Sequence, residues 1–446
     1  MPVVLNIKSE DVDNNEKRSK YTVSVLGCGQ TGIFFAIAFA MAGFKVLCFD
    51  ADLSVVRKVA RGKTPFSQQE IEGKLRNLIG LGQLSVTSDI KKAVSQSDIM
   101  VIAIPAKIDA QKKVDYTELI NACKQVGASL HPGVLIICSS IVGFGCIEGT
   151  MKETIENSSG FKVEQDFGLA YVPVHNTEAC LMFQSPSFEF KVAAIGKNSL
   201  ETSANILKTI TKNVNSISNV KTAEIATLFA VAKADTSTAL ANELAIFCEN
   251  ANADYFEIMK LLKLNDERSC PTTVNEDNRD EAYLLLESAD NINAKLRLPA
   301  LSRQINEEMI KHAVNLTQEA LRSCGKTLRR ARVGILGSLN PTTATAVFVK
   351  MLELKGAKAS LYCTAPKREI SDFAVAKSSL NEAVEGSDCI VVLTKEEPFK
   401  RLNLKKLKAL TKTPTVIVDL AGAFQPDEVK IEGFIYRGLG RGKEEK

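Results

Sequence analysis

The chain has 446 residues, of which 45% are apolar and 24% charged. This length exceeds one ordinary hydrophobic core and predicts two or three globular domains. The formal net charge of +4 is too small for the basic footprint of a nucleic-acid-binding protein. The densest basic run, residues 400–412, carries leucines near helical spacing, which favours a solvated amphipathic helix over a site for an anionic partner.

Cysteines and histidines are too scattered to indicate a metal site. Eleven cysteines form no C-x-x-C pair, and the three histidines lie far apart in the chain. Zinc sites need close ligand pairs, and no disulfide framework is apparent, so we expect no metal and a reducing compartment. The longest apolar runs are too short or too interrupted to span a bilayer, and the N-terminus lacks a signal-peptide core. We therefore expect a cytoplasmic protein.

Strand-like and helix-like segments alternate after a polar, mobile tail expected over residues 1–20. The runs typical of buried strands are YTVSVLG, KVLCFD, DIMVIAIP, VLIICSS, LAYVPV and FKVAAIG, and the helical run IFFAIAFAMAG separates the first two. Alternation of this kind predicts a parallel, doubly wound sheet within residues 21–215.

A helical middle and a second strand-rich region follow. Residues 222–251 contain neither Pro nor Gly and predict one long helix, and a second helical block spans residues 281–324. Strands then return as RVGILG, KASLYC, CIVVLT and TVIVDLAG. The sequence thus predicts an α/β fold in which two doubly wound Rossmann-like domains, 21–215 and 328–446, are joined by a central helical domain, 216–327.

A glycine-rich turn joins the first strand to the first helix. Gly27, Gly29 and Gly32 form G-x-G-x-x-G, with Gln30 and Thr31 between the last two glycines. The first glycine permits the tight turn, the second admits a pyrophosphate, and the third lets helix and strand pack closely. The phosphates would then lie at the positive end of the helix.

An acid at the end of the second strand completes this pattern. Asp50 lies 23 positions after Gly27, where a carboxylate accepts hydrogen bonds from an adenosine ribose and repels a 2′-phosphate. The pattern therefore predicts NAD rather than NADP. The alternative is a vestigial nucleotide fold whose glycines serve only the turn. Cys28, inside the turn, is interpreted as a small packing residue.

Several longer stretches resemble the UDP-glucose/GDP-mannose dehydrogenase family. They are DADLSVVRKVARGKTPFSQQEIEGKL, ALANELA, AYLLLESA, LSRQINEEM, GSDCIVVLTKEEPFKRLNL and GFIYRGLGRG. Within the family, the chain is most similar to the branch that oxidises UDP-N-acetylmannosamine or UDP-N-acetylglucosamine. The resemblance implies an NAD-binding domain, a homodimer formed through the central helix and a C-terminal domain that binds UDP. It also implies double oxidation of a sugar 6-hydroxyl with two NAD.

The family's catalytic positions are not matched. Alignment on DEAYLLLE places Glu276 where the family has its thiol, and counting from ALANE places Thr227 and Val231 at its lysine and asparagine. Val174 and His175 replace the glutamate and arginine of the S-P-E-R-like stretch. The charged run of the UDP-binding domain corresponds to GSLNPTTATAV, residues 337–347, which lacks the family's lysine, acids and arginine.

Five residues remain candidates for a role near the cofactor. Cys270 could be a catalytic thiol, although its acidic neighbours disfavour a thiolate, and a loop cysteine is the alternative. His175 could be a general base or a hydrogen-bonded loop histidine. Ser139 and Ser140 match the family's loop beside the nicotinamide ribose, and Pro105 matches the proline of its T-P pair.

Two functions therefore compete. The first is an NAD-dependent oxidoreductase acting on a nucleotide sugar with a rebuilt reaction pocket. The second is a non-catalytic NAD-binding member that regulates an active paralogue through the long helix.

Overall fold

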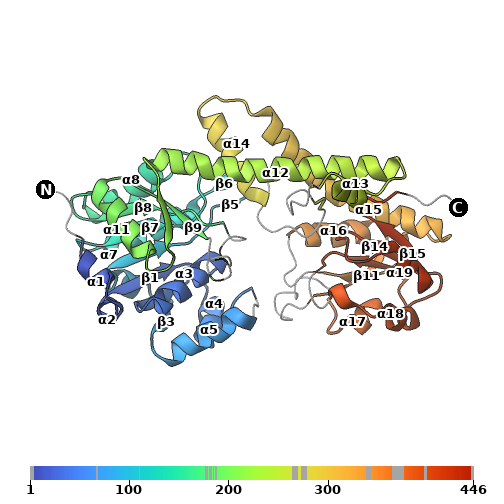
Figure 1. Ribbon diagram of the computed structural model, residues 1–446, viewed down its shortest axis with the longest axis horizontal. Coiled ribbons are helices and arrows are strands. Elements are labelled where there is room, and N and C mark those ends of the chain that lie inside the picture. The colour runs from blue at the N-terminus through green and yellow to red at the C-terminus, as the bar shows by residue number, and fades with distance from the viewer. Residues whose placement is uncertain are drawn as a thin grey trace. The chain divides into compact units, whose positions relative to one another are not determined.

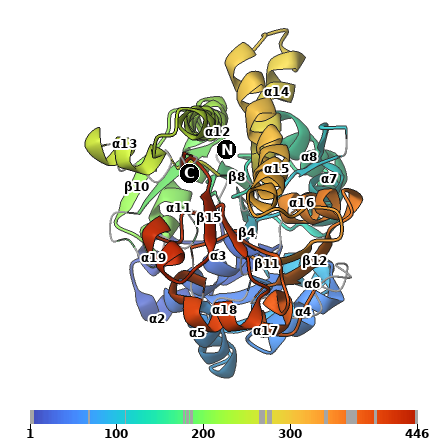
Figure 2. The same ribbon diagram turned by 90° about the vertical axis from the view of Figure 1, so that its right-hand side faces the viewer.

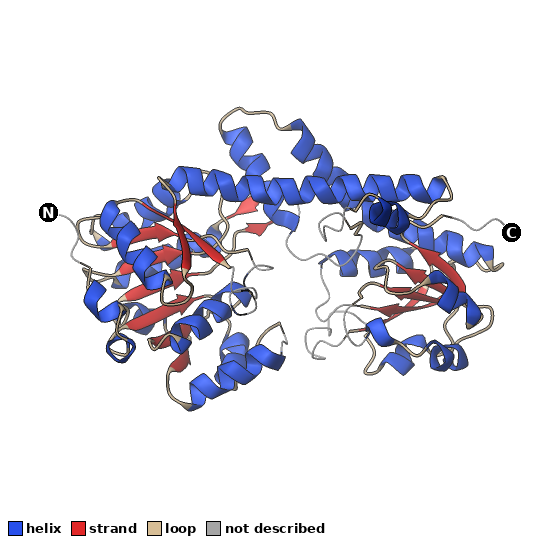
Figure 3. Cartoon of the chain, in the orientation of Figure 1, coloured by secondary structure: helices blue, strands red, loops and turns tan. Residues whose placement is uncertain are grey.

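The computed structural model describes residues 5–66, 69–109, 111–175, 179, 183, 185, 188–263, 270–272, 279–337, 343–363, 376–395 and 399–442. The chain forms two compact units: Met1–Val231 with Asp280–Lys295, and Ala232–Arg279 with Leu296–Lys446. Each unit contains a β-sheet flanked by helices, so the predicted α/β class is confirmed (Figures 1 and 3). The helical segment 216–327 is divided between the two units.

The first unit is built on an eight-stranded sheet in the order β10-β9-β8-β7-β4-β1-β2-β3. From β1 the chain adds strands to one side and then to the other, which is the doubly wound topology. All pairs are parallel except β8 with β9, which pair antiparallel near one edge. The strands are β1 Thr22–Leu26, β2 Lys45–Phe49, β3 Leu84–Thr87, β4 Ile99–Ile102, β7 Leu135–Cys138, β8 Gly168–Tyr171, β9 Glu189–Ala194 and β10 Asn213–Ser216.

The six strands predicted in this region all form, and two further strands appear at the edges of the sheet. The edge strands β3 and β10 were not predicted because few of their residues are buried. The central strands are buried throughout, and their side chains alternate between two cores. Val23 and Val25 pack with helices α3 Gln30–Met41, α5 Gln69–Gly80 and α11 Lys197–Leu207, whereas Leu26 packs toward α6 Ile90–Ser95, α7 Thr117–Ser129 and α8 Lys152–Ser159.

The segment before the first strand is folded, which corrects the expected polar tail for residues 5–20. It forms two short helices, α1 Ser9–Val12 and α2 Asn15–Arg18. Ile7 and Val12 are buried in the core, and the hydroxyl of Tyr21 donates a hydrogen bond to Asp11 at 2.9 Å. The sequence concealed this because three apolar side chains among many polar and charged ones give no periodic pattern.

The second unit contains a five-stranded, wholly parallel sheet in the order β12-β11-β13-β14-β15. Its strands are β11 Arg332–Leu336, β12 Lys358–Tyr362, β13 Cys389–Val392, β14 Val416–Asp419 and β15 Ile435–Gly438. Helices α15 Arg297–Ser323 and α16 Thr343–Leu354 contribute to one core (Figure 2), and α17 Leu380–Val384, α18 Leu404–Leu410 and α19 Pro426–Ile431 to the other. Helix α18 buries Leu407 and exposes its lysines Lys405 and Lys406, as an amphipathic helix does.

The remaining elements connect these sheets. Helix α12, Val220–Asn250, is continuous over 31 residues, as predicted, and the division between the units falls within it. The predicted block 281–324 consists of two helices, α14 Ala282–Asn291 in the first unit and α15 in the second. Smaller elements are α4 Leu53–Ala60, α13 Tyr255–Leu261 and the hairpin of β5 Lys107–Ile108 with β6 Val114–Asp115. Among the described helices, none combines the length and apolarity that crossing a bilayer requires.

Candidate functional site

The glycine turn between β1 and α3 has the geometry that the motif predicts. Gly27 has a φ of +99°, and a Cβ there would lie 2.6 Å from the carbonyl oxygen of Ala103. A Cβ on Gly32 would lie 1.8 Å from the carbonyl oxygen of Gly27, so the helix and the turn touch through their backbones. A Cβ on Gly29 would meet no atom within 4 Å. Two glycines are therefore required by the fold, and the third faces open space.

That open space lies at the N-terminus of helix α3, for which Gly29 is the N-cap. The first turn of a helix has backbone N–H groups without an acceptor inside the helix, and its dipole favours an anion. Gln30 is partly exposed at this turn, and Thr31 is buried. The residues present thus fit a pyrophosphate approaching the backbone at Gly29.

Asp50 is held at the end of β2 by backbone donors. Its Oδ2 accepts a hydrogen bond from the N–H of Cys28 at 2.8 Å, and its Oδ1 accepts one from the N–H of Asp52 at 2.9 Å. These bonds connect the ribose-side acid directly to the glycine turn. The thiol of Cys28 is buried, and a hydrogen bond with Cys48 together with burial raises its pKa, which suits a packing residue rather than a nucleophile.

Ser139 and Ser140 follow β7 and connect it to the end of β4. Both hydroxyls donate to carbonyl oxygens, Ser139 to Ile102 at 3.3 Å and Ser140 to Ile104 at 2.8 Å. Ser139 is fully buried, so its side chain packs within the protein. Pro105, after β4, is exposed at the same edge of the sheet.

Residues 143–147, which continue this loop, are held by three side chains that sequence reasoning missed. The N–H of Gly143 donates to the hydroxyl of Tyr116 at 2.9 Å, and the N–H of Phe144 donates to Ser288 Oγ of α14 at 3.0 Å. The two oxygens of Glu224, in α12, accept from the N–H groups of residues 145 and 147 at 2.8 and 2.9 Å. Glu224 is fully buried, and burial raises its pKa although the two N–H donors oppose the shift.

His175 lies close to this loop and opposite a carboxylate. The N–H of Val174 donates to the carbonyl oxygen of Ser139 at 3.2 Å, which places His175 beside the residues that follow β7. The imidazole Nε2 is 2.7 Å from Oε2 of Glu281, the N-cap residue of α14. Glu281 carried no signal in the sequence, because 106 positions separate it from His175.

Cys270 belongs to the second unit, whereas His175 and the glycine turn belong to the first. Its side chain is partly exposed. Two positions further on, the N–H of Thr272 donates to Asn242 Oδ1 of α12 at 2.8 Å. Glu276, which aligns with the family's thiol, lies outside the described residues, as do residues 338–342 of the expected UDP-binding run.

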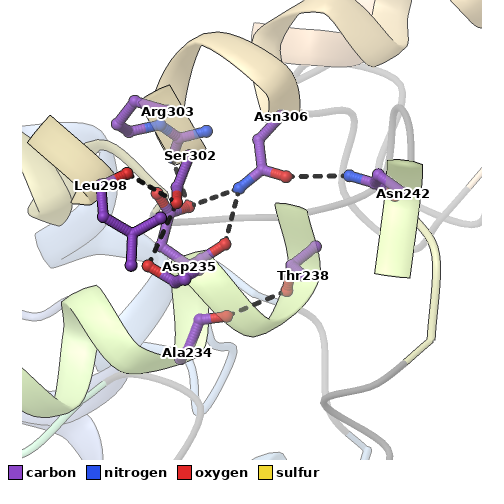
Figure 4. A network of polar contacts seen from close by, with 9 residues as sticks. Ala234, Asp235, Thr238, Asn242, Leu298, Ser302, Arg303 and Asn306 are labelled. Carbon is purple, nitrogen blue, oxygen red and sulfur yellow. Dashed lines mark hydrogen bonds and ion pairs between the residues drawn. The ribbon is translucent and has the colours of Figure 1, made fainter. Parts of the chain in front are cut away.

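Asn242 is part of a buried polar network between α12 and α15 (Figure 4). Its amide donates to Asn306 Oδ1 at 2.8 Å, and the amide of Asn306 donates to Asp235 Oδ1 at 2.8 Å. Arg303 Nη1 forms an ion pair with the same Asp235 oxygen at 3.1 Å. A buried network of this kind fixes the register of two helices because each polar group needs its partner. The stretches ALANELA and LSRQINEEM, which carry the resemblance, contain three of its four members.

The sheet, the glycine turn at a helix N-terminus and the acid after β2 together define a dinucleotide-binding protein. In the part of the chain that the structure describes, no group of three or more His, Cys, Asp or Glu side chains could hold a metal ion.

Comparisons with known proteins agree with this class. Residues 21–215 match the NAD binding domain of the UDP-glucose/GDP-mannose dehydrogenase family, and residues 342–426 match its UDP binding domain. Together the two matches cover more than half of the chain. The chain belongs to this family, its first domain is the family's NAD-binding domain, and NAD is its cofactor.

Individual relatives extend over nearly the whole chain. The UDP-N-acetyl-D-mannosamine dehydrogenase of Pyrococcus horikoshii is 25% identical over 430 residues, which are 94% of this chain and 99% of the relative. A solved structure of UDP-D-ManNAc dehydrogenase from that organism has a TM-score of 0.81 at 24% identity, with 94% and 99% covered. A UDP-glucose dehydrogenase structure from Pyrobaculum islandicum has a TM-score of 0.80 at 17% identity, with 94% and 98% covered. The expected fold and family are thus confirmed.

The contrast between Gly29 and Gly32 gives a first prediction. Gly29→Ala should weaken NAD binding by about tenfold or more, about 1.4 kcal/mol, because the new methyl group enters the space that the phosphates need. Its melting temperature should stay that of the wild type, since Gly29 has a φ of −68° and no neighbour near its Cβ direction. Calorimetric titration with NAD and thermal denaturation measure the two effects.

Gly32→Ala is the matched control, because its Cβ would overlap the backbone at Gly27. It should lower the melting temperature clearly. Unchanged NAD affinity in Gly29→Ala would contradict the assignment of the open space to the cofactor.

Glu224 gives a prediction about pH. Its folded pKa lies above the ordinary value of 4.5, so the folded protein binds this proton more tightly than the unfolded chain does. The contribution to stability is therefore complete below pH 4.5 and is lost as the pH rises through the folded pKa. Thermal denaturation should show that the wild type loses stability over this window relative to Glu224→Gln, which has no such proton. Parallel stability curves for the two proteins would refute the coupling.

Proposed function

We propose that the chain is an NAD-dependent dehydrogenase of a UDP-N-acetylhexosamine, acting in nucleotide-sugar metabolism and polysaccharide biosynthesis, with a reaction pocket that differs from the family pattern. The observation that carries this proposal is the open backbone at Gly29 beside Asp50 in the family's NAD-binding domain. The UDP-N-acetyl-D-mannosamine dehydrogenases among the relatives support the choice of sugar class. A cytoplasmic location remains part of the proposal.

The departures at the family's catalytic positions support the altered pocket. Thr227, at the lysine position, donates its hydroxyl to the carbonyl oxygen of Ala223 within the same helix at 2.8 Å. A threonine bonded in this way carries no charge to stabilise a developing oxyanion. Val231, at the asparagine position, offers no hydrogen-bond donor.

A non-catalytic NAD-binding subunit is the second candidate. The loss of the family's lysine and asparagine, together with Val174 in place of its glutamate, favours it. Removing several members of one catalytic unit leaves mainly binding. Such a subunit would bind NAD and regulate an active paralogue.

Turnover of nucleotide sugars distinguishes the two candidates. The protein is mixed with NAD and, in turn, UDP-N-acetylmannosamine, UDP-N-acetylglucosamine and UDP-glucose, and NADH is followed by its absorbance. The enzyme proposal expects NADH with an N-acetylhexosamine substrate above the rate without protein. Binding of NAD in calorimetry without any NADH from the panel would favour the regulatory candidate.

Cys270→Ala tests the role of the thiol in the same assay. We expect this variant to lose at least about 100-fold in rate if Cys270 is the nucleophile, because removing such a group costs several orders of magnitude. An unchanged rate would make Cys270 a loop residue.

We also propose a homodimer formed through the central helical region. Leu240, Leu244 and Phe247 of α12 are 58%, 44% and 67% exposed, and their spacing of four and three residues places them on one face. Leu261 and Leu262 at the end of α13 are exposed as well. Monomers seldom expose so many large apolar side chains close together. A second copy of the chain is the partner that the family resemblance favours.

The dimer predicts a change of mass on substitution. Phe247→Glu should convert the dimer to a monomer in light scattering, because two carboxylates would be buried at the interface. Leu81→Glu, at an exposed apolar residue of the first unit, is the control and should leave the mass unchanged. A monomeric wild type would contradict the proposal.

A further inference from the structure

His175 and Glu281 form a histidine–carboxylate pair within the first unit. Their Nε2 and Oε2 atoms are 2.7 Å apart, and the side chains are 23% and 19% exposed. The Glu281 oxygen itself is buried and accepts no well-aligned hydrogen bond in the described part of the chain. A buried carboxylate oxygen is costly unless a donor or positive charge compensates it, and the imidazole is the group placed to do so.

The pair is anchored on both sides by contacts already described. His175 follows Val174, whose N–H is bonded to Ser139 beside the end of β7. Glu281 begins α14, and α14 is joined to the same loop through Ser288 Oγ and the N–H of Phe144. The N-terminus of α14 favours the charged form of a carboxylate. The imidazole and its partner are therefore supported by two separate elements that meet at one loop.

Sheet order places this pair at a particular distance from the ribose-side acid. Asp50 follows β2 and His175 follows β8, and the strands run β2-β1-β4-β7-β8. Four spacings of about 4.8 Å separate β2 from β8, or about 19 Å along the carboxyl edge. A dinucleotide binds across this edge, with its adenosine at the acid after β2. Its nicotinamide end is then expected on the side of β7 and β8, where His175 lies.

The chemistry of the pair matches what oxidation of an alcohol requires. A carboxylate 2.7 Å from one ring nitrogen stabilises the imidazolium that forms when the ring takes up a proton. An imidazole oriented in this way is a general base near neutral pH. The family's glutamate position next to it is Val174, which cannot take a proton.

We propose that His175 is the general base of the dehydrogenase reaction and that Glu281 is its positioning residue. This inference rests on the proposed function. In the step, the C–H bond of the substrate carbinol breaks and its hydride passes to bound NAD, while the O–H electrons form the carbonyl bond. The hydroxyl proton passes to the imidazole of His175. The sugar alcohol is oxidised by two electrons, and NADH and a proton are the other products.

The position of His175 can be tested without turnover. Diethyl pyrocarbonate modifies accessible neutral imidazoles, and the chain has only three histidines, which peptide mass spectrometry can follow separately. We expect NADH to slow modification of His175 at least fivefold and ADP-ribose, which lacks the nicotinamide, to slow it much less. His312 is an internal reference in the second unit, because it faces Glu249 at 2.9 Å with a similar exposure of 22%. Equal protection of both histidines, or of neither, would overturn the placement.

Turnover of UDP-N-acetylmannosamine and UDP-N-acetylglucosamine tests the chemical role. His175→Ala should lower kcat by about 100-fold or more, within the range for a lost general base, with little change in KM. Added imidazole should restore part of the rate in His175→Ala. Glu281→Gln should lower kcat at least about tenfold while His175 remains. His131→Ala, at a histidine in the loop before β7 and so at the opposite edge of the sheet, is the control with wild-type kcat.

The outcomes separate the two proposals. NADH formation by the wild type that persists in His175→Ala would overturn the base assignment and leave the proposed function intact. Loss of rate in His175→Ala without rescue by imidazole, together with unprotected His175 in the modification experiment, would also overturn it. A wild type that binds NAD in calorimetry but yields no NADH from the panel would remove both the enzyme proposal and the base.

Discussion

The contact between the backbone of Gly27 and that of Gly32 is the constraint on which the cofactor site depends. A methyl group at position 32 would lie 1.8 Å from the Gly27 carbonyl oxygen, so the strand, the turn and the helix can meet only if no side chain intervenes. This contact directs the N-terminus of α3 toward the end of β1. It also brings the N–H of Cys28 to Asp50, which couples the phosphate end of the site to the ribose end. The open side of Gly29 is a consequence of the same geometry.

The loop of residues 143–147, which follows β7, is held in place by hydrogen bonds to three side chains. Glu224 of α12, Tyr116 before α7 and Ser288 of α14 supply acceptors to consecutive N–H groups of residues 143–147. Burying a carboxylate such as Glu224 is unfavourable, and the two N–H groups offset part of that cost. The loop after β7 is thereby joined to two helices, and α14 carries Glu281 toward His175. The conformation of this loop thus depends on side chains that come from three distant parts of the sequence.

The residues that match the family and those that depart from it have different places in the structure. Asn242, Arg303 and Asn306 lie in stretches that match the family, and the structure shows them in one buried network with Asp235. Those residues join α12 to α15 through side-chain hydrogen bonds and an ion pair. Thr227 and Val231, which differ from the family pattern, lie in the same helix, are partly buried and take no part in this network.

The sequence by itself determined the fold class, the family, six strands of the first sheet, the long helix α12 and the glycine turn with Asp50. These features are local: a turn that only glycine allows, short continuous apolar runs in the buried strands, and a helix without Pro or Gly. Tertiary structure alone decided that residues 5–20 are folded, that Glu224 closes the loop after β7, and that Glu281 faces His175. Each of these joins residues far apart in the chain through one or two side chains, which leaves no periodic or spacing signal. Contacts of that kind exist only once the sheet has brought its strand ends to a common edge.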